Sequence, residues 1–257
     1  RQTSPSQVMT NFRTRIKESS SNKSRIILAN DLDHLSVAKL ESATIKNIKT
    51  LNKFLCAIKF NFHLILPLGT KELTKINRIA HDAGLQTIAD IKLNDIGNTN
   101  KNVVERLWKM GFDAVIVNPI MGPENLKNLV LSAHKHDNGI ISLVHMSHPG
   151  AKLGYGLVVK PSGSKKLLRL HELFLEWSHS LSIDGIVVGA TVPEIIKSCH
   201  KKIKGRFDIY SPGVGTQGGD PATAIRAGAN YLIVGRTILN AKDPVKEAKK
   251  LQELSLE

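Results

Sequence analysis

From residue 26 onward, short apolar runs alternate with longer segments in which apolar residues recur every three or four positions. The short, β-branched runs predict buried strands, and the longer periodic segments predict helices. We expect strands at residues 26–29, 55–60, 87–91, 114–117, 140–145, 185–188, 208–210 and 231–234. We expect helices at residues 36–54, 70–83, 99–110, 123–136, 167–180, 193–203, 221–227 and 244–254.

This alternation predicts the fold class. Strand–helix repeats imply a parallel sheet with right-handed crossovers. Eight such units in 257 residues fit a single α/β domain, a (β/α)8 TIM barrel over residues 25–257. An open doubly wound sheet is the alternative, but its phosphate-binding glycines follow the first strand. Residues 30–34 read Asn-Asp-Leu-Asp-His and contain no glycine, which favours the barrel.

Residues 1–24 are polar, basic and rich in serine, and we expect a short N-terminal helical extension or linker. Ser6 is a candidate cap for a helix with an apolar side made by Val8, Met9, Phe12 and Ile16. We expect this helix to pack against the bottom of the barrel, and a transit peptide is the alternative. The chain starts with Arg1 rather than Met, so we expect a trimmed protein or a piece of a longer one.

The composition is that of an ordinary globular protein, with 41% apolar and 23% charged residues. No apolar run reaches the length of a membrane span, and no signal peptide opens the chain. The two cysteines, Cys56 and Cys199, have no metal-like spacing. We therefore expect a cytoplasmic protein with no membrane partner, no structural zinc and no disulfide.

The charge balance is strongly basic, with 36 Lys and Arg against 22 Asp and Glu, a formal net charge of +14. Such a balance is typical of proteins that bind nucleic acid, or of a basic surface around a site for a small anion. The basic residues are scattered over many segments, and aromatic residues make up only 5% of the chain. Stacking platforms for bases are therefore scarce. We expect solvated helix faces and no nucleic-acid partner.

The end of the third predicted strand carries Asp90, Lys92 and Asp95. Side chains alternate along a strand, so Asp90 and Lys92 should point the same way, into the catalytic end of a barrel. Lys59 ends the second strand and should meet them. Mutual pairing keeps buried charges ionised, and a lysine held between acids is a well-placed proton donor. A surface ion-pair cluster is the alternative interpretation.

A second group of residues predicts a phosphate site. Residues 211–220, after the seventh strand, contain four glycines and Gln217, and Gly235 and Arg236 follow the eighth strand. Barrels often bind phosphate with these two loops, because glycines let backbone amides approach and arginine adds a bidentate contact. His145 and His148 end the fifth strand and are further acid–base candidates, but we expect structural roles for both.

The chain resembles the orotidine 5'-monophosphate decarboxylase family in its compact archaeal style, over roughly residues 25–250. The resemblance rests on four segments: Asp90–Asp95, Met146–Ala151 (Met-Ser-His-Pro-Gly-Ala), Ser211–Pro221 with its Pro-Gly-Val-Gly-Thr-Gln-Gly-Gly core, and Gly235-Arg236. The first and last segments are shared with related sugar-phosphate barrels. The other two are similar to those of the decarboxylase alone.

The resemblance implies decarboxylation of orotidine 5'-monophosphate to UMP in pyrimidine biosynthesis, without metal or organic cofactor. By this resemblance Lys92 protonates C6 of the base, and Lys59 and Asp90 belong to the same charge array. Asp95 and Thr99 reach into the site of the other subunit, so a homodimer is implied. Substrate ligands are implied for the ribose (Asp31), the base (Ser147) and the phosphate (Gln217, Gly235 and Arg236). The loop after Ser147 and part of the segment after the seventh strand correspond to the lid.

Several positions depart from the family's pattern. Asn30 stands where an apolar or small residue is expected, and Asn118-Pro119 stands where His-Gly is usual. The lid from residue 152 to 164 is rich in lysine, and the second base contact maps loosely to Ala190-Thr191. Three alternatives stay open: a magnesium-dependent sugar-phosphate synthase or decarboxylase, a non-catalytic phosphate-binding barrel, and a fragment of a bifunctional UMP synthase.

Overall fold

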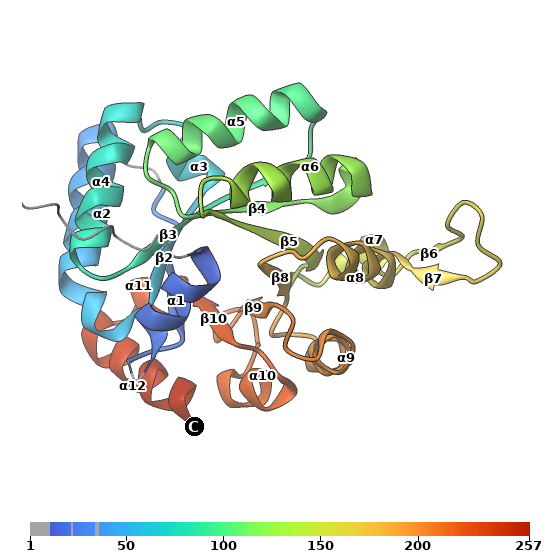
Figure 1. The fold of residues 1–257 in the computed structure, drawn as a ribbon. Helices are drawn as coiled ribbons and strands as arrows, with labels where there is room; N and C mark the ends of the chain where they lie inside the picture. The colour runs from blue at the N-terminus through green and yellow to red at the C-terminus, as the bar shows by residue number, and fades with distance from the viewer. Residues whose placement is uncertain (1–10, 22, 34–35) are drawn as a thin grey trace, which may run out of the picture.

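The computed structural model describes residues 11–21, 23–33 and 36–257, and it is a closed barrel of eight parallel strands (Figure 1). Around the barrel the strands follow the order β1-β10-β9-β8-β5-β4-β3-β2. Their bounds are β1 Ile26–Ala29, β2 Ala57–Asn61, β3 Gln86–Leu93, β4 Ala114–Val117, β5 Gly139–His145, β8 Gly185–Val188, β9 Asp208–Pro212 and β10 Tyr231–Val234. All eight predicted strands are confirmed, with shifted ends in β2, β3, β5 and β9.

Helices surround the barrel and connect its strands (Figure 1). The main helices are α2 Val37–Leu51, α4 Thr70–Asp82, α5 Gly97–Lys109, α6 Pro123–His134, α8 Leu170–Ser180, α9 Pro193–Ile203, α10 Pro221–Ala227 and α12 Pro244–Leu256. Short helical turns are η1 Asn52–Phe54, α3 Phe62–Ile65, η2 Pro119–Met121, α7 Ala151–Tyr155 and α11 Arg236–Leu239. The predicted (β/α)8 barrel is therefore confirmed. None of the described helices is long and apolar enough to cross a membrane.

Side-chain alternation along the strands produces two apolar cores. In β1, Ile27 points into the barrel, whereas its neighbour Leu28 packs against the surrounding helices. The inner core contains further strand residues such as Ile88 and Leu143, and the outer core joins strands to helix residues such as Ile48. Burial of both faces explains why these strands read as continuous apolar runs. The apolar filling leaves the polar strand ends as the place for chemistry.

The N-terminal helix α1, Phe12–Ser20, closes the bottom of the barrel. Phe12 and Ile16 are fully buried in the inner core, as expected. The ring of Phe12 occupies the space beside Gly139 in which any Cβ atom would collide with it. The cap of the described helix is Asn11, whose side chain accepts a hydrogen bond from the Thr14 amide at 3.0 Å. Ser6, Val8 and Met9 lie outside the described residues.

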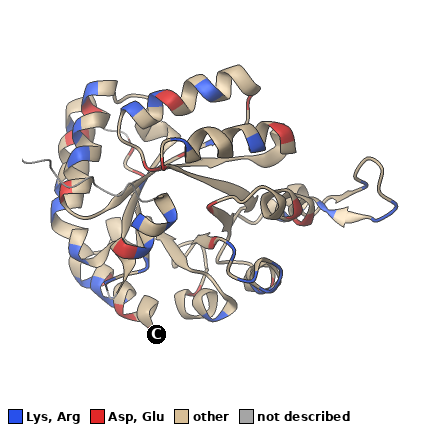
Figure 2. Ribbon diagram, in the orientation of Figure 1, with Lys and Arg blue, Asp and Glu red and all other residues tan. Residues whose placement is uncertain are grey.

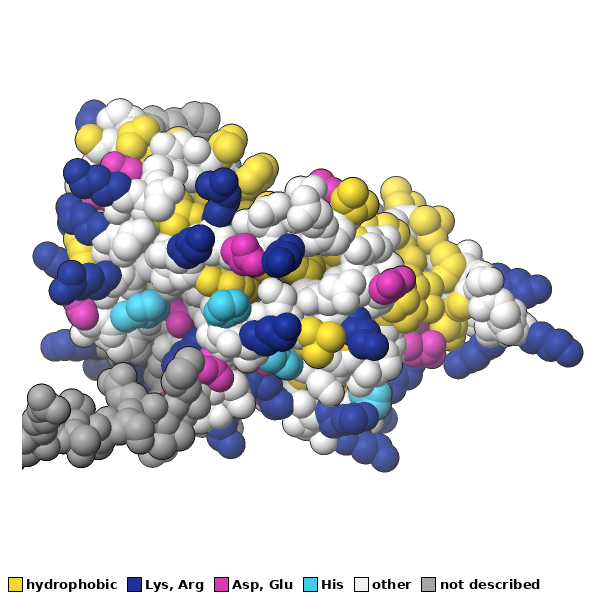
Figure 3. Space-filling view, turned by 45° about the horizontal axis from the view of Figure 1, so that its top comes forward, with side chains coloured by type: hydrophobic (Ala, Val, Ile, Leu, Met, Phe, Trp, Pro, Cys, Tyr) yellow, Lys and Arg dark blue, Asp and Glu magenta, His cyan; other side chains and the backbone are white. Residues whose placement is uncertain are grey.

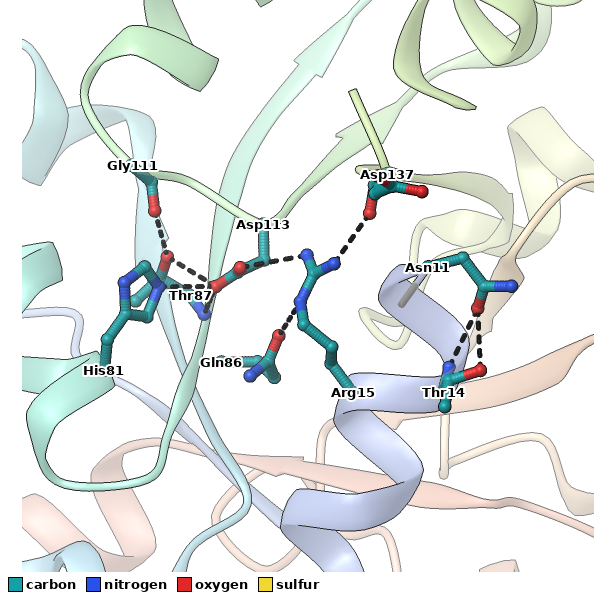
Figure 4. A network of polar contacts seen from close by, with 9 residues as sticks. All are labelled: Asn11, Thr14, Arg15, His81, Gln86, Thr87, Gly111, Asp113 and Asp137. Carbon is teal, nitrogen blue, oxygen red and sulfur yellow. Dashed lines mark hydrogen bonds and ion pairs between the residues drawn. The ribbon is translucent and has the colours of Figure 1, made fainter. Parts of the chain in front are cut away.

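A polar network fastens α1 to the bottom of the barrel (Figure 4). The Asp113 carboxylate at the start of β4 accepts hydrogen bonds from Arg15 at 3.1 Å and from the Thr87 amide at 2.7 Å. His81 Nε2 of α4 lies 2.8 Å from the same carboxylate. Arg15 also donates to Gln86 at 3.1 Å. The network therefore ties α1, α4, β3 and β4 together.

The histidines at the bottom of the barrel predict a pH-dependent stability. The hydrogen bond to Asp113 raises the pKa of His81 above 6.5 despite partial burial, and the hydrogen bond to Asp184 raises the pKa of His134 in the same way. A raised pKa in the folded state means that both pairs stabilise fully below pH 6.5 and lose this contribution as pH rises through the folded-state pKa values. Each side chain is 38% exposed, so solvent screening limits each pair to about 1 kcal/mol or less.

Thermal unfolding between pH 5.5 and 8.5 measures this contribution. As pH increases above 6.5, we expect the midpoint temperature of unfolding to decrease more steeply for the wild-type protein than for a His81→Gln/His134→Gln variant. Parallel curves for the two proteins would show that neither histidine is linked to folding.

Candidate active site

A cavity of about 410 Å³ opens at the C-terminal ends of the strands. Its polar lining comes from the ends of six strands and the loops that follow them, which the barrel brings to one place. Of the ten predicted site residues, eight line it: Asp31, Lys59, Asp90, Lys92, Ser147, Gln217, Gly235 and Arg236. Two further polar residues in the lining belong to segments that the sequence pointed to, Asn61 at the end of β2 and Thr216 in the loop after β9. Asp33, His63 and Thr237 also line it and were not singled out, and their signal was their position just beyond a strand end.

Asp90 lies at the centre of the charge array. Its two carboxylate oxygens contact different lysines, Lys59 Nζ at 2.9 Å and Lys92 Nζ at 2.8 Å. Lys59 also lies 3.5 Å from Asp31. The Lys59 side chain is only 5% exposed, whereas Lys92 is 35% exposed and can meet a ligand in the cavity.

The pairing keeps the buried members of this array ionised. Burial raises the pKa of Asp90, but attraction to Lys59 and Lys92 and their hydrogen bonds outweigh it and lower the pKa below the usual value. Burial lowers the pKa of Lys59, but Asp90 and Asp31 outweigh it and raise the pKa. The cavity therefore holds a carboxylate and an ammonium group with restricted access to water, which strengthens their action on a ligand.

Lys92 reaches the cavity by a route that the sequence did not predict. Its backbone has a φ of +47°, and the pairing of β3 with β4 is irregular between Asp90 and Leu93. A bulge of this kind re-aims side chains and is common beside active sites. Asp90 and Lys92 face the same cavity, as predicted, but the strand that carries them is bulged and not regular.

Asp95 and Thr99 lie apart from the cavity of their own chain and are exposed. They flank the start of α5, where Asn100 fixes the turn by donating to the Asp95 carbonyl at 2.6 Å and accepting from the Asp95 amide at 3.0 Å. Within one chain the fourth charged group of the array is therefore Asp31, not Asp95. Asp95 instead lies at the rim of the barrel, where the two hydrogen bonds with Asn100 hold its backbone in place.

The glycine-rich loop after β9 forms the wall opposite the charge array. Positive φ angles at Gly213, Gly215 and Gly218 allow a compact turn, closed by hydrogen bonds such as that from the Gly215 amide to the Gly219 carbonyl at 2.8 Å. The turn places Gln217 so that its Oε1 accepts from Ser147 Oγ at 2.7 Å. The loops after β5 and β9 therefore meet over the cavity.

The positions that depart from the family's pattern have local explanations. Asn30 is fully buried and hydrogen-bonded to Thr44 and Asn47 of α2, at 2.9 and 2.8 Å, so its polar groups are satisfied. Asn118 caps η2 through the Ile120 amide at 3.2 Å. Thr191 donates to the Ser147 carbonyl at 2.8 Å and thereby supports Ser147.

The two histidines after β5 differ in their surroundings. His145 is buried, its Nδ1 lies 2.7 Å from the Met146 carbonyl, and burial lowers its pKa. His148 lines the cavity. His145 therefore has the structural surroundings that we expected.

The segment after β5 that the resemblance implies to be a lid is a hairpin in this structure. Residues 156–169, here called the arm, form an antiparallel hairpin of β6, Val158–Val159, and β7, Leu168–Arg169 (Figure 1). The arm extends away from the barrel and does not line the cavity. The lid role of residues 152–164, which the resemblance implies, therefore stays a prediction.

Known proteins are similar to this chain in sequence and in fold. The sequence model of the orotidine 5'-phosphate decarboxylase / HUMPS family matches residues 24–251. The chain is 34% identical to the orotidine 5'-phosphate decarboxylase of Pyrococcus abyssi over 213 residues, which cover 83% of this chain and 93% of that protein. It is also 34% identical to that of Thermococcus kodakarensis over 236 residues, 91% of this chain and 98% of that protein.

Solved structures agree with the sequence comparison. The crystal structure of orotidine 5'-phosphate decarboxylase from Pyrococcus horikoshii matches with a TM-score of 0.72 at 31% identity, covering 90% of this chain and 99% of that one. The decarboxylase of Leishmania donovani has a TM-score of 0.83, at 20% identity, with 96% of this chain and 100% of that one covered, and shows the fold alone. The chain belongs to the orotidine 5'-phosphate decarboxylase / HUMPS family.

Proposed function

We propose that this chain decarboxylates orotidine 5'-monophosphate to UMP and carbon dioxide, with Lys92 as the proton donor. The observation that carries the proposal is the buried Asp90 between Lys59 and Lys92, facing a glycine-rich loop and Arg236 across one cavity. The names of the relatives support the same reaction. The experiment that tests it is turnover by the purified protein, followed as formation of UMP, and a folded protein that forms none contradicts it.

The cavity's two ends fit the two ends of this substrate. Arg236, Gln217 and the backbone amides beside Gly235 are the phosphate ligands, and Asp31 and Lys59 bind the ribose hydroxyls. Ser147 contacts the base. With the phosphate held at one end, C6 and its carboxylate lie against Asp90 and Lys92 at the other. Binding energy from the remote phosphate then serves the reaction at C6.

The reaction needs a cation and a proton at the carbon that loses its carboxylate. The C6–carboxylate bond breaks, carbon dioxide leaves, and the electron pair stays on C6. The Lys92 ammonium group is already oriented by Asp90 at 2.8 Å, so it stabilises this charge without reorganisation and delivers its proton to C6. Lys92 regains a proton from water when the product leaves. Apart from the substrate and water, every group in this step belongs to the protein.

The magnesium-dependent alternative needs free carboxylate oxygens, which are the ligands that this ion prefers. Both oxygens of Asp90 already contact ammonium groups, so this carboxylate has no free oxygen for the ion.

Replacing Arg236 with alanine is expected to weaken the binding of phosphorylated ligands selectively. Loss of a charge-assisted contact to phosphate predicts a Kd for UMP that rises roughly tenfold to a hundredfold, with the Kd for uridine nearly unchanged. Isothermal titration calorimetry measures both constants. Arg226→Ala is the matched control, since Arg226 is an exposed arginine on α10 outside the cavity. Equal losses for UMP and uridine would contradict the phosphate role of Arg236.

We also propose a homodimer in which Asp95 and Thr99 complete the neighbouring site. Large apolar side chains are exposed on the loops after four consecutive barrel strands, β2 to β5: Phe62, Leu66, Ile96, Ile120, Leu153, Leu157, Val158 and Leu167. Hydrophobic side chains gather beside the basic end of the arm (Figure 3). An exposed apolar rim of this kind marks a protein interface. Asp95 and Thr99 lie on the same rim, beside Ile96.

A cytoplasmic location and the absence of a nucleic-acid partner remain part of the proposal. Cys56 and Cys199 are buried free thiols, which fits a reducing compartment. Lys and Arg are spread over the outer helices and the arm, with Asp and Glu among them (Figure 2). A dispersed charge of this kind favours solvation over a nucleic-acid groove.

A further inference from the structure

The predicted phosphate site is made of two separate pieces of chain. One piece is the glycine-rich loop after β9, and the other is Gly235-Arg236 at the start of α11, after β10. Regular pairing of β9 with β10 ends at Pro212 and Ile233. Beyond that point the strand ladder does not fix one piece against the other, so another contact must set their separation.

The Thr237 side chain makes that contact. Its Oγ1 donates to the Val214 carbonyl at 3.1 Å and accepts from the Thr216 amide at 3.1 Å. Thr216 Oγ1 lies 3.1 Å from the same oxygen. One hydroxyl group on α11 thus holds both the start and the middle of the loop after β9.

The hydrogen bonds leave Thr237 no proton for a ligand. A hydroxyl group has one proton and two lone pairs. The proton goes to the Val214 carbonyl, so the Thr216 amide and the Thr216 hydroxyl are the donors in the other two contacts. Although Thr237 lines the cavity, its hydroxyl group makes its hydrogen bonds to the loop and not to a ligand.

The loop is shaped for this close approach at Gly215. Gly215 has a φ of +73°, and a Cβ atom there would collide with the Thr237 hydroxyl and lie 2.9 Å from its Cγ2. Glycine is therefore required at 215 both for the backbone conformation and for the contact with Thr237.

We propose that Thr237 is a positioning residue that latches the glycine-rich loop onto α11 and so preassembles the phosphate site. This inference rests on the proposed function for the identity of the ligand. The latch holds the loop at Val214 and Thr216, three residues and one residue before Gln217, and Thr237 itself directly follows Arg236. Both Gln217 and Arg236 are therefore held in place before the phosphorylated ligand arrives. Ordering the loop in advance removes an entropic penalty from binding. Thr237 acts through Gln217 and Arg236 and does not touch the ligand itself.

The test compares Thr237→Val, which keeps the side-chain shape and removes the hydroxyl group, with Thr237→Ser, which keeps the hydroxyl group. We expect Thr237→Val to raise the Kd of UMP roughly tenfold, as for the loss of one net hydrogen bond, and to leave the Kd of uridine unchanged. Thr237→Ser should stay within about twofold of wild type for both ligands. Amide hydrogen exchange of residues 214–219 in the free protein should be faster in Thr237→Val alone. Thr74→Val, on the exposed side of α4, is the matched control.

Three results would overturn the latch. If Thr237→Val binds UMP with the wild-type Kd, Thr237 does not position the loop for the phosphate. If the variant binds uridine and UMP equally weakly, the substitution has disturbed the whole cavity. A Thr237→Ser variant as weak as Thr237→Val shows that shape, not the hydroxyl group, matters. Failure of the decarboxylase proposal can be distinguished from failure of the latch, because UMP binding and amide hydrogen exchange are measured without turnover. A wild-type protein that binds neither UMP nor inorganic phosphate would end both proposals.

Discussion

Replacing Lys92 with alanine should lower the rate of orotidine 5'-monophosphate decarboxylation by at least about a thousandfold, because the step loses its proton donor and its preorganised cation together. The fold should persist. Lys92 is 35% exposed, and Asp90 keeps its contact with Lys59 at 2.9 Å, so no buried charge is left without a partner. Initial rates under substrate saturation measure the loss, and circular dichroism with thermal unfolding reports the fold.

The matched control for Lys92 is Lys101→Ala. Lys101 is 65% exposed on α5 and makes only a distant pair with Glu105 at 3.9 Å. This variant should turn over like wild type, which separates loss of one positive charge from loss of the donor. Turnover by Lys92→Ala within tenfold of wild type would remove Lys92 as the proton donor.

Replacing Asp95 with alanine should also cause a large loss of turnover, although Asp95 does not line the cavity of its own chain. The physical reason is the proposed dimer, in which Asp95 joins the array of the neighbouring subunit beside Lys92 and holds it by attraction between opposite charges. Co-expression of Lys92→Ala and Asp95→Ala chains provides the measurement. In a mixed dimer, one site receives an intact Lys92 from one chain and an intact Asp95 from the other.

The dimer predicts how much activity the co-expressed Lys92→Ala and Asp95→Ala chains should recover. With equal amounts of both chains and random pairing, half of the dimers are mixed and one of their two sites is intact, so roughly a quarter of wild-type activity should return. Each variant alone stays inactive. No recovery in co-purified mixed dimers, or a fully active Asp95→Ala protein, would show that Asp95 does not act across subunits. Asn98→Ala, on the exposed start of the same helix, is the control.

The sequence was sufficient for the features that local patterns determine. Four strands, such as β1 at Ile26–Ala29, have the predicted bounds, because both faces of each strand are buried and its apolar run is uninterrupted. Polar residues at strand ends were identified for a similar reason, since the barrel carries every strand end to one rim. The pairing of Asp31 with Lys59 was not predicted, because the resemblance placed Asp31 at the ribose and not in the charge array.

Features that depend on tertiary contacts escaped prediction. The φ of +47° at Lys92 has no marker in its sequence, since left-handed lysine is uncommon and is maintained by its surroundings. The arm's strands have two residues each, too short for any periodic signal. The anchoring of α1 through Arg15 and Asp113 joins residues 98 positions apart.

The most direct test of the central claim is the loss of ultraviolet absorbance of orotidine 5'-monophosphate with purified protein, with EDTA or with added Mg²⁺. We predict equal rates in both, with one UMP and one carbon dioxide formed for each substrate consumed. No turnover by folded, dimeric protein would contradict the proposal, as would turnover that EDTA abolishes and Mg²⁺ restores. The latter result would move the chain to the metal-dependent sugar-phosphate chemistry of related barrels.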